Sequence, residues 1–413
     1  MKKLSLGLIC IAPLAALALM RWQTPDTSET PNKVTIQNGS APKPEIQNLS
    51  LAQADNNFGV KLLQVLAKQD SKSNVVISPT SLAVALQMTY NGADGKTAAA
   101  MAQTLQIGGL SLDGLNTGNA ALLKTLANPE AGVELHVANS LWTRASLTPL
   151  PDFVARNQSY YGATLGDLSG GAEAVNGWVS EQTKGKIPTI ITPDDAQNSD
   201  AILANAVYFK GAWTKQFKTQ NTKTEPFTPL TGAPQNVPMM NESGEFRYFA
   251  NKDYQAADLN YGRGPIEMTV LLPTSGVKFA DFIARLTPQA FAPDFKMRYG
   301  NVGLPRFKTE YGAEMKTPLS ALGMGVAFDA QKADFSKMFS GGKFYIGFVK
   351  HKTYLDVNEA GTEAAAATAV GMTRMAMPAP QNPFTMKMNR PFVFAIRDTE
   401  SGAILFIGAV THI

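Results

Sequence analysis

The segment that decides how this chain is interpreted is Asn358–Pro380, which reads NEAGTEAAAATAVGMTRMAMPAP. It follows a strand-like stretch over 345–357, and another apolar, strand-like stretch lies beyond it. The four alanines at 364–367 favour a helix on propensity alone. Gly361 and Gly371 weaken that helix because glycine loses more backbone freedom than any other residue when it is ordered. A short surface helix followed by a loop is therefore one of two interpretations.

The second interpretation reads the segment with the period of a β-strand. One face then carries mostly small or β-branched side chains, which suit a strand that slides between existing strands of a sheet. These residues are Thr362, Ala364, Ala366, Thr368, Val370 and Met372. The following run, Met372-Thr-Arg-Met-Ala-Met377, is suited to filling the substrate cleft of a protease.

The rest of the chain mixes helical and strand periodicities. Asp55 is a candidate cap for a first helix, and Ser78 caps a second helix that starts at Pro79 and stops at Asn91-Gly92. Strands are predicted over 133–137, 202–209 and 266–272, and a hairpin over 391–397 and 403–410. The nearly all-apolar stretch 202–209 predicts a strand that is covered on both faces. Helices concentrate early and strands late, which predicts an α+β fold.

Composition excludes several classes of protein. The 413 residues are 44% hydrophobic and 17% charged, which is typical of globular chains and excludes disordered, collagenous and coiled-coil ones. Lys and Arg total 37 against 33 Asp and Glu, and the net charge of +4 is not concentrated in a basic patch. We therefore expect no nucleic-acid partner. Three histidines and one cysteine offer little for metal binding, and we expect no metal and no cofactor.

The N-terminus is predicted to direct export. Residues 1–20 have two lysines ahead of an apolar run, which is typical of a signal peptide, and an uncleaved signal anchor is the alternative. Cys10 lies inside this run after an isoleucine, an unsuitable context for lipid attachment. Residues 21–48 are rich in proline and polar residues and predict a linker, so that 49–413 form one large domain. The expected location is periplasmic, extracellular or tethered to the envelope.

A search for a catalytic site finds none. The chain has no Gly-x-Ser-x-Gly, no His-Glu-x-x-His and no paired cysteines. The stretch 92–97 (GADGKT) is too short for a phosphate loop and follows a helix where a strand is required. Of the three histidines, His136 and His412 have no suitable surroundings for a nucleophilic triad, and His351 is more typical of a hydrogen-bonded core residue. An enzyme is therefore not expected.

Several motifs together resemble the serpin family over essentially all of 49–413. The hinge segment Glu359–Thr368 is similar to the family's proximal hinge almost residue for residue. The stretches Asn74–Ser81, Asn205–Trp213, Asn389–Phe394 and Ile404–Gly408 resemble other family signatures, in the right order. The resemblance implies the serpin fold, an α+β architecture with three β-sheets, about eight or nine helices and an exposed reactive-centre loop. A bacterial-type exported member is expected from the N-terminus.

The resemblance also assigns two groups of site residues. The hinge of the loop comprises Glu359, Gly361, Thr362, Glu363, Ala364, Ala365, Ala366, Ala367 and Thr368. A buried polar group, here called the shutter cluster, comprises Ser78, Ser81, Asn205 and His351. The cluster is expected to act as a hydrogen-bonded latch that breaks when the central strands separate.

By the same resemblance, the chain is expected to be a suicide-substrate inhibitor of a serine protease. The protease forms its acyl-enzyme on the loop, and the cut loop then enters the central sheet and carries the protease with it. Counting from Glu359 places the reactive bond at Met375–Ala376, which suits an elastase-, chymotrypsin- or subtilisin-like enzyme. The alternative bond, Arg374–Met375, suits a trypsin-like enzyme.

The resemblance also allows expectations about a polyanion activator, the oligomeric state and a second possible function. Residues 118–125, which would match the family's heparin-binding helix, contain a single basic residue, Lys124, so activation by a heparin-type polyanion is not expected. A monomer is expected. A non-inhibitory serpin that acts as a binding or chaperone-like protein is the alternative, and the intact hinge argues against it.

Overall fold

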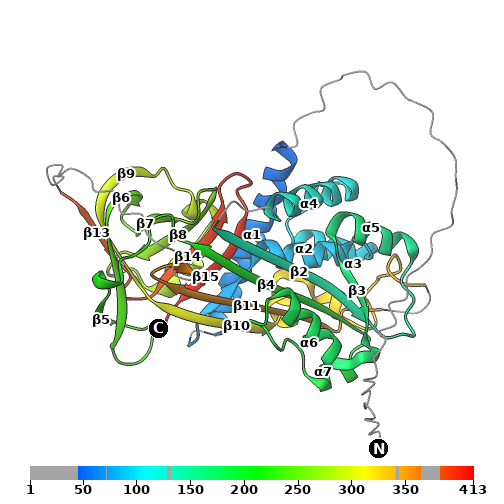
Figure 1. The fold of residues 1–413 in the computed structure, drawn as a ribbon. Coiled ribbons are helices and arrows are strands. Elements are labelled where there is room, and N and C mark those ends of the chain that lie inside the picture. The colour runs from blue at the N-terminus through cyan, green and yellow to red at the C-terminus, as the bar shows by residue number, and fades with distance from the viewer. Residues whose placement is uncertain (1–44, 71, 128–131, 341–343, 364–381) are drawn as a thin grey trace, which may run out of the picture. The chain divides into compact units, whose positions relative to one another are not determined.

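A six-stranded sheet lies at the centre of the computed structural model, which describes residues 45–70, 72–127, 132–340, 344–363 and 382–413 (Figure 1). Its strand order is β10 (Phe307–Glu314), β11 (Phe348–Asn358), β12 (Gly361–Thr362), β4 (Ala201–Ala212), β2 (Val133–Thr143) and β3 (Thr164–Asp167). β4 also pairs directly with β11 in parallel, beyond the two residues of β12.

Helices cover both faces of this sheet. Along β4 nearly every residue is buried, as the apolar run predicts. Ile202 and Ala204 pack under α6 (Gly171–Gln182), whereas Leu203 belongs to the core that includes α2 (Pro79–Tyr90). α2 begins after Ser78, whose hydroxyl accepts a hydrogen bond from the Ser81 amide, as expected for its N-cap.

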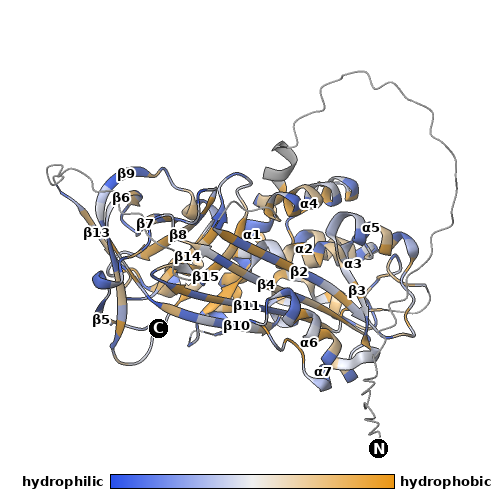
Figure 2. Cartoon of the chain, in the orientation of Figure 1, coloured by the Kyte–Doolittle hydropathy of each residue, from blue (hydrophilic) through white to orange (hydrophobic). Residues whose placement is uncertain are grey.

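A second sheet contains nine strands. Their order is β1 (Val75–Ile77), β15 (Ile404–Val410), β14 (Phe392–Asp398), β8 (Ile266–Pro273), β7 (Tyr254–Asn260), β6 (Gln235–Ala250), β9 (Lys296–Pro305) and β13 (Phe384–Lys387), with β5 (Lys223–Phe227) paired to β6. Hydrophobic residues line the hairpin of β14 and β15 (Figure 2). This is the hairpin that the sequence predicts.

The long strand β6 explains how the three expected sheets are connected. Its last residues, from Tyr248 to Ala250, pair with β7, and its earlier residues, from Met239 to Tyr248, pair with β9. The resemblance implies three sheets, whereas the described strands form two, because β6 joins nine of them into one continuous hydrogen-bonded sheet beside the six-stranded one. The α+β serpin fold is otherwise as expected.

Nine α-helices occur in the described part of the chain, in agreement with the eight or nine expected. Besides α2 and α6 they are α1 (Glu45–Gln69), α3 (Gly95–Thr104), α4 (Leu112–Leu126), α5 (Pro151–Tyr161), α7 (Pro193–Gln197), α8 (Phe279–Ala284) and α9 (Lys316–Leu319). None of the helices within these residues is long and apolar enough to cross a membrane. α1 begins at Glu45, inside the stretch 21–48 that the sequence predicts as a linker.

The expected role of Asp55 as a helix cap is wrong. Asp55 lies inside α1 and is fully buried, and its Oδ1 accepts a hydrogen bond from Gln87 Nε2 at 2.8 Å. Burial raises the pKa of the Asp55 carboxyl, and the hydrogen bond only partly offsets that effect. Gln87 in turn accepts from Asn119. The carboxyl group therefore belongs to a polar network between helices, which no local sequence signal marks.

Candidate functional site

The hinge of the predicted loop begins as a strand inside the central sheet. Gly361 and Thr362 form β12 between β11 and β4, with Thr362 opposite Val357 on one side and Gly211 on the other. The chain reaches this position from β11 through a turn at Glu359, whose carbonyl accepts from the Phe217 amide at 3.0 Å. Two residues of an additional strand are therefore already in place.

Glycine is required at position 361. Its φ is +151°, and a Cβ placed there would lie 2.0 Å from the carbonyl oxygen of Gly211. No larger side chain fits without moving the backbone of β4.

Two stacked aromatic residues, Tyr261 and Trp213, hold Thr362 and the turn before it in place. Thr362 is fully buried, and its hydroxyl lies 2.6 Å from the hydroxyl of Tyr261. The Tyr261 ring stacks on Trp213 at 4.2 Å, and the Trp213 indole Nε1 donates to the carbonyl of Asn358. Burial raises the pKa of the Tyr261 hydroxyl far above its ordinary value, so this hydroxyl stays protonated. One aromatic pair thus fixes both ends of the turn into β12.

The Glu359 carboxylate anchors the turn from the other side. Arg306 donates to it in bidentate fashion, from the guanidinium Nη2 at 2.6 Å and from Nε at 3.2 Å. Thr222 adds a third hydrogen bond at 2.7 Å. Burial alone would raise the pKa of Glu359, but these donors outweigh it and the pKa is lowered. The carboxylate is therefore ionised at neutral pH.

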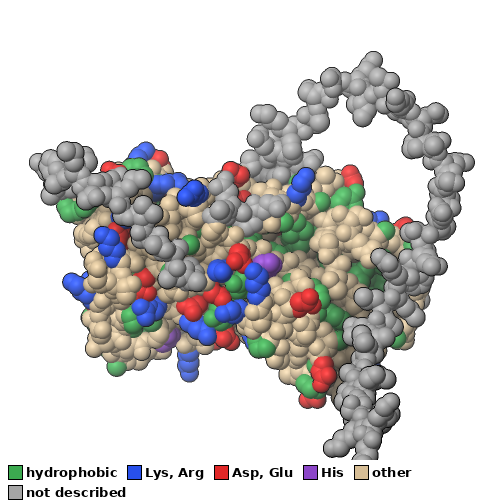
Figure 3. Space-filling model, viewed as in Figure 1, with side chains coloured by type: hydrophobic (Ala, Val, Ile, Leu, Met, Phe, Trp, Pro, Cys, Tyr) green, Lys and Arg blue, Asp and Glu red, His purple; other side chains and the backbone are tan. Residues whose placement is uncertain are grey.

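Glu363 follows β12, and its amide donates to the carbonyl of Asp356 in β11 at 2.7 Å. Its φ is +52°, in the left-handed region that is unusual for a residue with a side chain. Its carboxylate pairs with Lys186 at 2.5 Å, in the segment between α6 and α7, and this hydrogen bond raises the pKa of Lys186. A left-handed backbone and an ion pair therefore interrupt the strand conformation at Glu363. On the face shown in Figure 3, basic and acidic side chains are interspersed.

Past β12, there is no gap between β4 and β11 for a further strand. Beyond β12, β4 and β11 pair directly in parallel, from Ile202 opposite Phe348 to Tyr208 opposite Tyr354. A longer inserted strand would have to separate these two strands.

The shutter cluster lies across this closed seam. His351 of β11 is opposite Asn205 of β4, and its Nδ1 lies 2.5 Å from the Asn205 Oδ1. The amide of Ser78 donates to His351 Nε2 at 3.1 Å, so the imidazole carries its proton on Nδ1 and donates it to Asn205. Asn205 Nδ2 donates to the Ser81 hydroxyl and to Asn139 Oδ1. The four predicted residues are thus joined directly, and β2 is joined to them through Asn139.

Burial keeps His351 neutral. The ring is fully buried, which lowers its pKa to about 3. A neutral imidazole can both donate to Asn205 and accept from Ser78, whereas an imidazolium would lose the second bond. At neutral pH every ring nitrogen therefore has a partner.

Sequence reasoning missed four residues of this region. Asn139 was visible as a polar residue in an apolar strand, and its register opposite Asn205 brings it to the cluster. Tyr261, Arg306 and Lys186 carry no local signal, because each reaches the hinge from a distant part of the chain. Of the predicted hinge, Ala364, Ala365, Ala366, Ala367 and Thr368 lie outside the described residues, as do Arg374, Met375 and Ala376 of the predicted reactive bonds. The described residues contain no group of three or more potential metal ligands.

The fold places the first two residues of an additional strand, β12, between β11 and β4 of the central sheet, and this arrangement agrees with the serpin resemblance of the sequence. A sequence profile described as Serpin (serine protease inhibitor) matches residues 53–413. The chain belongs to the serpin family.

Several relatives support this assignment. A serpin-like protein of Thermococcus kodakarensis is 34% identical over 378 residues, which cover 89% of this chain and 87% of that protein. The leukocyte elastase inhibitor of Bos taurus is 33% identical over 379 residues, covering 87% of this chain and 99% of the inhibitor. The thermophilic serpin tengpin, solved in its native state, superimposes with a TM-score of 0.80 at 32% identity, covering 92% of this chain and 97% of tengpin. The similarity thus spans an archaeal protein and a mammalian one.

Proposed function

We propose that this protein is a serine protease inhibitor that traps its target by inserting the cleaved loop into the central sheet. It is not an enzyme in this proposal, because the protease supplies the nucleophile and the inhibitor is consumed. The observation that carries the proposal is β12, the first two residues of an additional strand between β4 and β11. A relative named leukocyte elastase inhibitor supports the same class of activity.

The register of β12 defines the path of insertion. Thr362 lies opposite Gly211 in antiparallel pairing, so a strand continuing in this register would bring Thr368 opposite Asn205. Thr368 would then enter between Asn205 and His351, which are now hydrogen bonded. Insertion therefore requires the shutter cluster to break. From Thr362 to Met375 such a strand would span about 45 Å at ~3.3 Å per residue, and a protease displaced on that scale has a distorted oxyanion hole and cannot deacylate.

The proposed reactive bond is Met375–Ala376, with Arg374–Met375 as the alternative. A methionine fits the apolar primary pocket of an elastase-, chymotrypsin- or subtilisin-like protease, and an arginine fits the acidic pocket of a trypsin-like one.

We also propose that residues 1–20 direct export, either as a cleaved signal peptide or as a retained anchor, and that the inhibitor is a monomer. A non-inhibitory, binding or chaperone-like serpin remains the second candidate.

The test is to incubate the protein separately with elastase, chymotrypsin, subtilisin and trypsin. The expected result is an SDS-stable complex on a gel together with a released peptide that spans 376–413 by mass. A peptide that starts at Met375 would move the reactive bond to Arg374. Cleavage by all four enzymes without any complex would contradict inhibition and favour the non-inhibitory candidate.

A further inference from the structure

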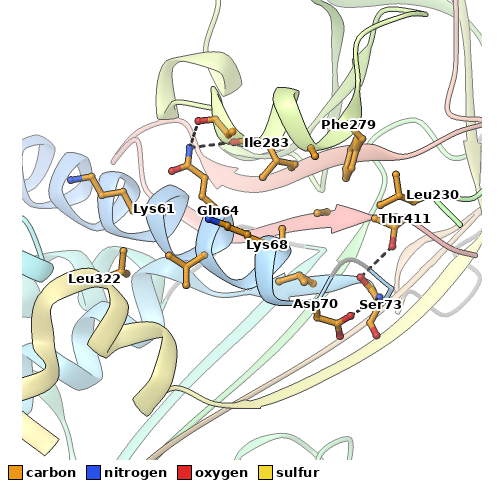
Figure 4. A pocket seen from close by; sticks show the side chains of 16 residues that line it. Lys61, Gln64, Lys68, Asp70, Ser73, Leu230, Phe279, Ile283, Leu322 and Thr411 are labelled. Atoms are coloured by element: carbon orange, nitrogen blue, oxygen red, sulfur yellow. Dashed lines mark hydrogen bonds between the residues drawn. The ribbon is translucent and has the colours of Figure 1, made fainter.

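A pocket of about 570 Å³ lies over the outward face of the C-terminal half of α1 (Figure 4). This volume falls within the range of ~300–1,000 Å³ that is typical of small-molecule sites. None of its lining residues belongs to the hinge or to the shutter cluster. The pocket is therefore separate from the proposed inhibitory machinery.

The floor and walls of the pocket are mostly apolar. Val65 of α1 and the strand residues Val75 and Ala409 contribute to the lining, and Phe279 and Ile283 of α8 form one wall. Leu230 lines one end of the pocket and is 37% exposed, so it adds to the apolar surface there. An apolar ligand body would cover this surface.

The wall made by α8 is fixed in place. Gln64 of α1 donates from its amide nitrogen to the carbonyl oxygens of Ile283, Ala284 and Leu286, at 3.0–3.2 Å, as the dashed lines in Figure 4 show in part. Ile283 and Ala284 end α8 and Leu286 follows it, and the Ile283 carbonyl also accepts from the Leu286 amide at 3.1 Å. These hydrogen bonds tie the end of α8 to α1, the two helices that line the pocket.

The rim of the pocket is cationic. Lys61 and Lys68 are two turns apart on one face of α1, and neither ammonium group has an ion-pair or hydrogen-bond partner within the described residues. The carboxylate at the rim, Asp70, accepts from the amides of Lys72 at 2.9 Å and Ser73 at 3.1 Å, and the Lys72 amide does most to lower its pKa. Both amides donate to the same oxygen, Oδ1, so the rim carries one carboxylate against the two lysines and keeps an excess of positive charge for an anion.

From this geometry we propose that the pocket binds a free amphipathic carboxylate, a molecule with one anionic head and a long apolar body. The apolar body of the ligand lies in the pocket between α1 and α8, and its carboxylate pairs with Lys61 or Lys68. The N-terminal apolar run of this chain is a poorer occupant by charge. It follows Lys2 and Lys3 and is followed by Arg21, so positive charge at both ends would meet the positive rim.

Titration calorimetry of the full chain with dodecanoate, below its micelle concentration, tests the proposal. One saturable site per chain is expected, with at least tenfold weaker binding of dodecyltrimethylammonium, which has the same body and a cationic head. The double variant Lys61→Glu/Lys68→Glu should lose dodecanoate affinity at least tenfold. Ala280→Trp, on the exposed side of α8, should block the pocket, whereas Lys252→Glu, a charge reversal in the turn between β6 and β7, should bind normally.

Two results would overturn the proposal. One is no saturable binding of dodecanoate, or equal binding by the unmodified chain and Ala280→Trp. The other is efficient crosslinking, without ligand, from a benzophenone side chain at position 280 to residues 1–44 or to a second copy. Either crosslink would identify a protein segment as the occupant. Saturable binding of dodecanoate, together with no crosslink from position 280, supports the proposal. A thermal unfolding curve of each variant verifies that the variant is folded.

Discussion

In the proposed mechanism, Thr362 is the residue on which insertion depends first. Its side chain is fully buried against Tyr261, and the proposal requires the residues after it to follow the same path into the sheet. A charge at this position would have to be desolvated without a partner, at a cost of several kcal/mol.

Thr362→Arg is therefore expected to turn the inhibitor into a substrate. Cleavage by the target should continue, while the yield of SDS-stable complex falls at least tenfold. Thr362→Ser keeps the hydroxyl that meets Tyr261 and is the matched control, expected to trap nearly as well as the parent chain. Undiminished trapping by the arginine variant would contradict the proposed path.

His351 makes the stability of the protein depend on pH. Burial lowers its pKa to about 3 in the folded state, against an ordinary value of 6.5. Between these two values the unfolded chain binds a proton that the folded chain does not, so the free energy of unfolding decreases as the pH falls from about 6.5 toward 3. The full effect is on the order of 5 kcal/mol.

Urea unfolding at pH 7.5 and pH 4.5 measures this contribution. The unmodified chain should lose more stability on acidification than His351→Gln, which cannot take up the proton. His136→Gln is the control, because His136 is only partly buried and lies outside the shutter cluster. If acidification lowered the free energy of unfolding equally in the unmodified chain and in His351→Gln, protonation of His351 would not be the cause of the pH dependence.

At the scale of elements, the α6–α7 segment contacts the hinge through the ion pair of Lys186 with Glu363. In the proposed mechanism Glu363 is the next residue to enter the sheet, so this pair would set how readily β12 extends. Lys186 is 38% exposed at its side chain, so the pair is partly screened by solvent and is worth ~0.2–1 kcal/mol.

Lys186→Ala should therefore speed insertion modestly, by about two- to fivefold in the rate of complex formation. The physical reason is that Glu363, whose side chain is only 13% exposed, then moves without breaking an ion pair. Stopped-flow fluorescence of a probe on the loop measures the rate, with Lys184→Ala as the control, since Lys184 pairs with Glu134 instead. A slower rate for Lys186→Ala would show that the pair assists insertion.

The elements themselves were largely predictable from local sequence. The Ser78-Pro79 start of α2, the doubly buried β4 and the β14–β15 hairpin follow from capping, uninterrupted apolar residues and turn chemistry. Asp55 was mispredicted because a polar residue before an apolar repeat has the same pattern as a cap, and only the helices packed around it show that it is internal. The continuity of the nine-stranded sheet through β6 depends on pairing between distant strands, which periodicity does not encode.

At the scale of the whole molecule, the site is assembled from segments far apart in the sequence. The family resemblance named the hinge and the shutter cluster, but Arg306, Tyr261 and Lys186 were not predicted. Each is an ordinary residue in its own element and gains its role only when the two sheets and the α6–α7 segment meet at β12. Such contacts require the tertiary structure.

In the proposed mechanism, the six-stranded sheet accepts the cleaved loop as a further full-length strand. β4 and β11 now pair directly from Ile202 to Tyr208, so we expect a cleaved molecule to have more strand pairing than the intact one.

The most direct measurement is the thermal unfolding temperature of the protein before and after cleavage at the loop, with Thr362→Arg treated in the same way. The account predicts a rise on cleavage well beyond the ~2–4 °C that about 1 kcal/mol produces in domains of 150–250 residues, and a much smaller rise for Thr362→Arg. An unfolding temperature that is unchanged by cleavage would contradict loop insertion and, with it, the proposed mechanism of inhibition.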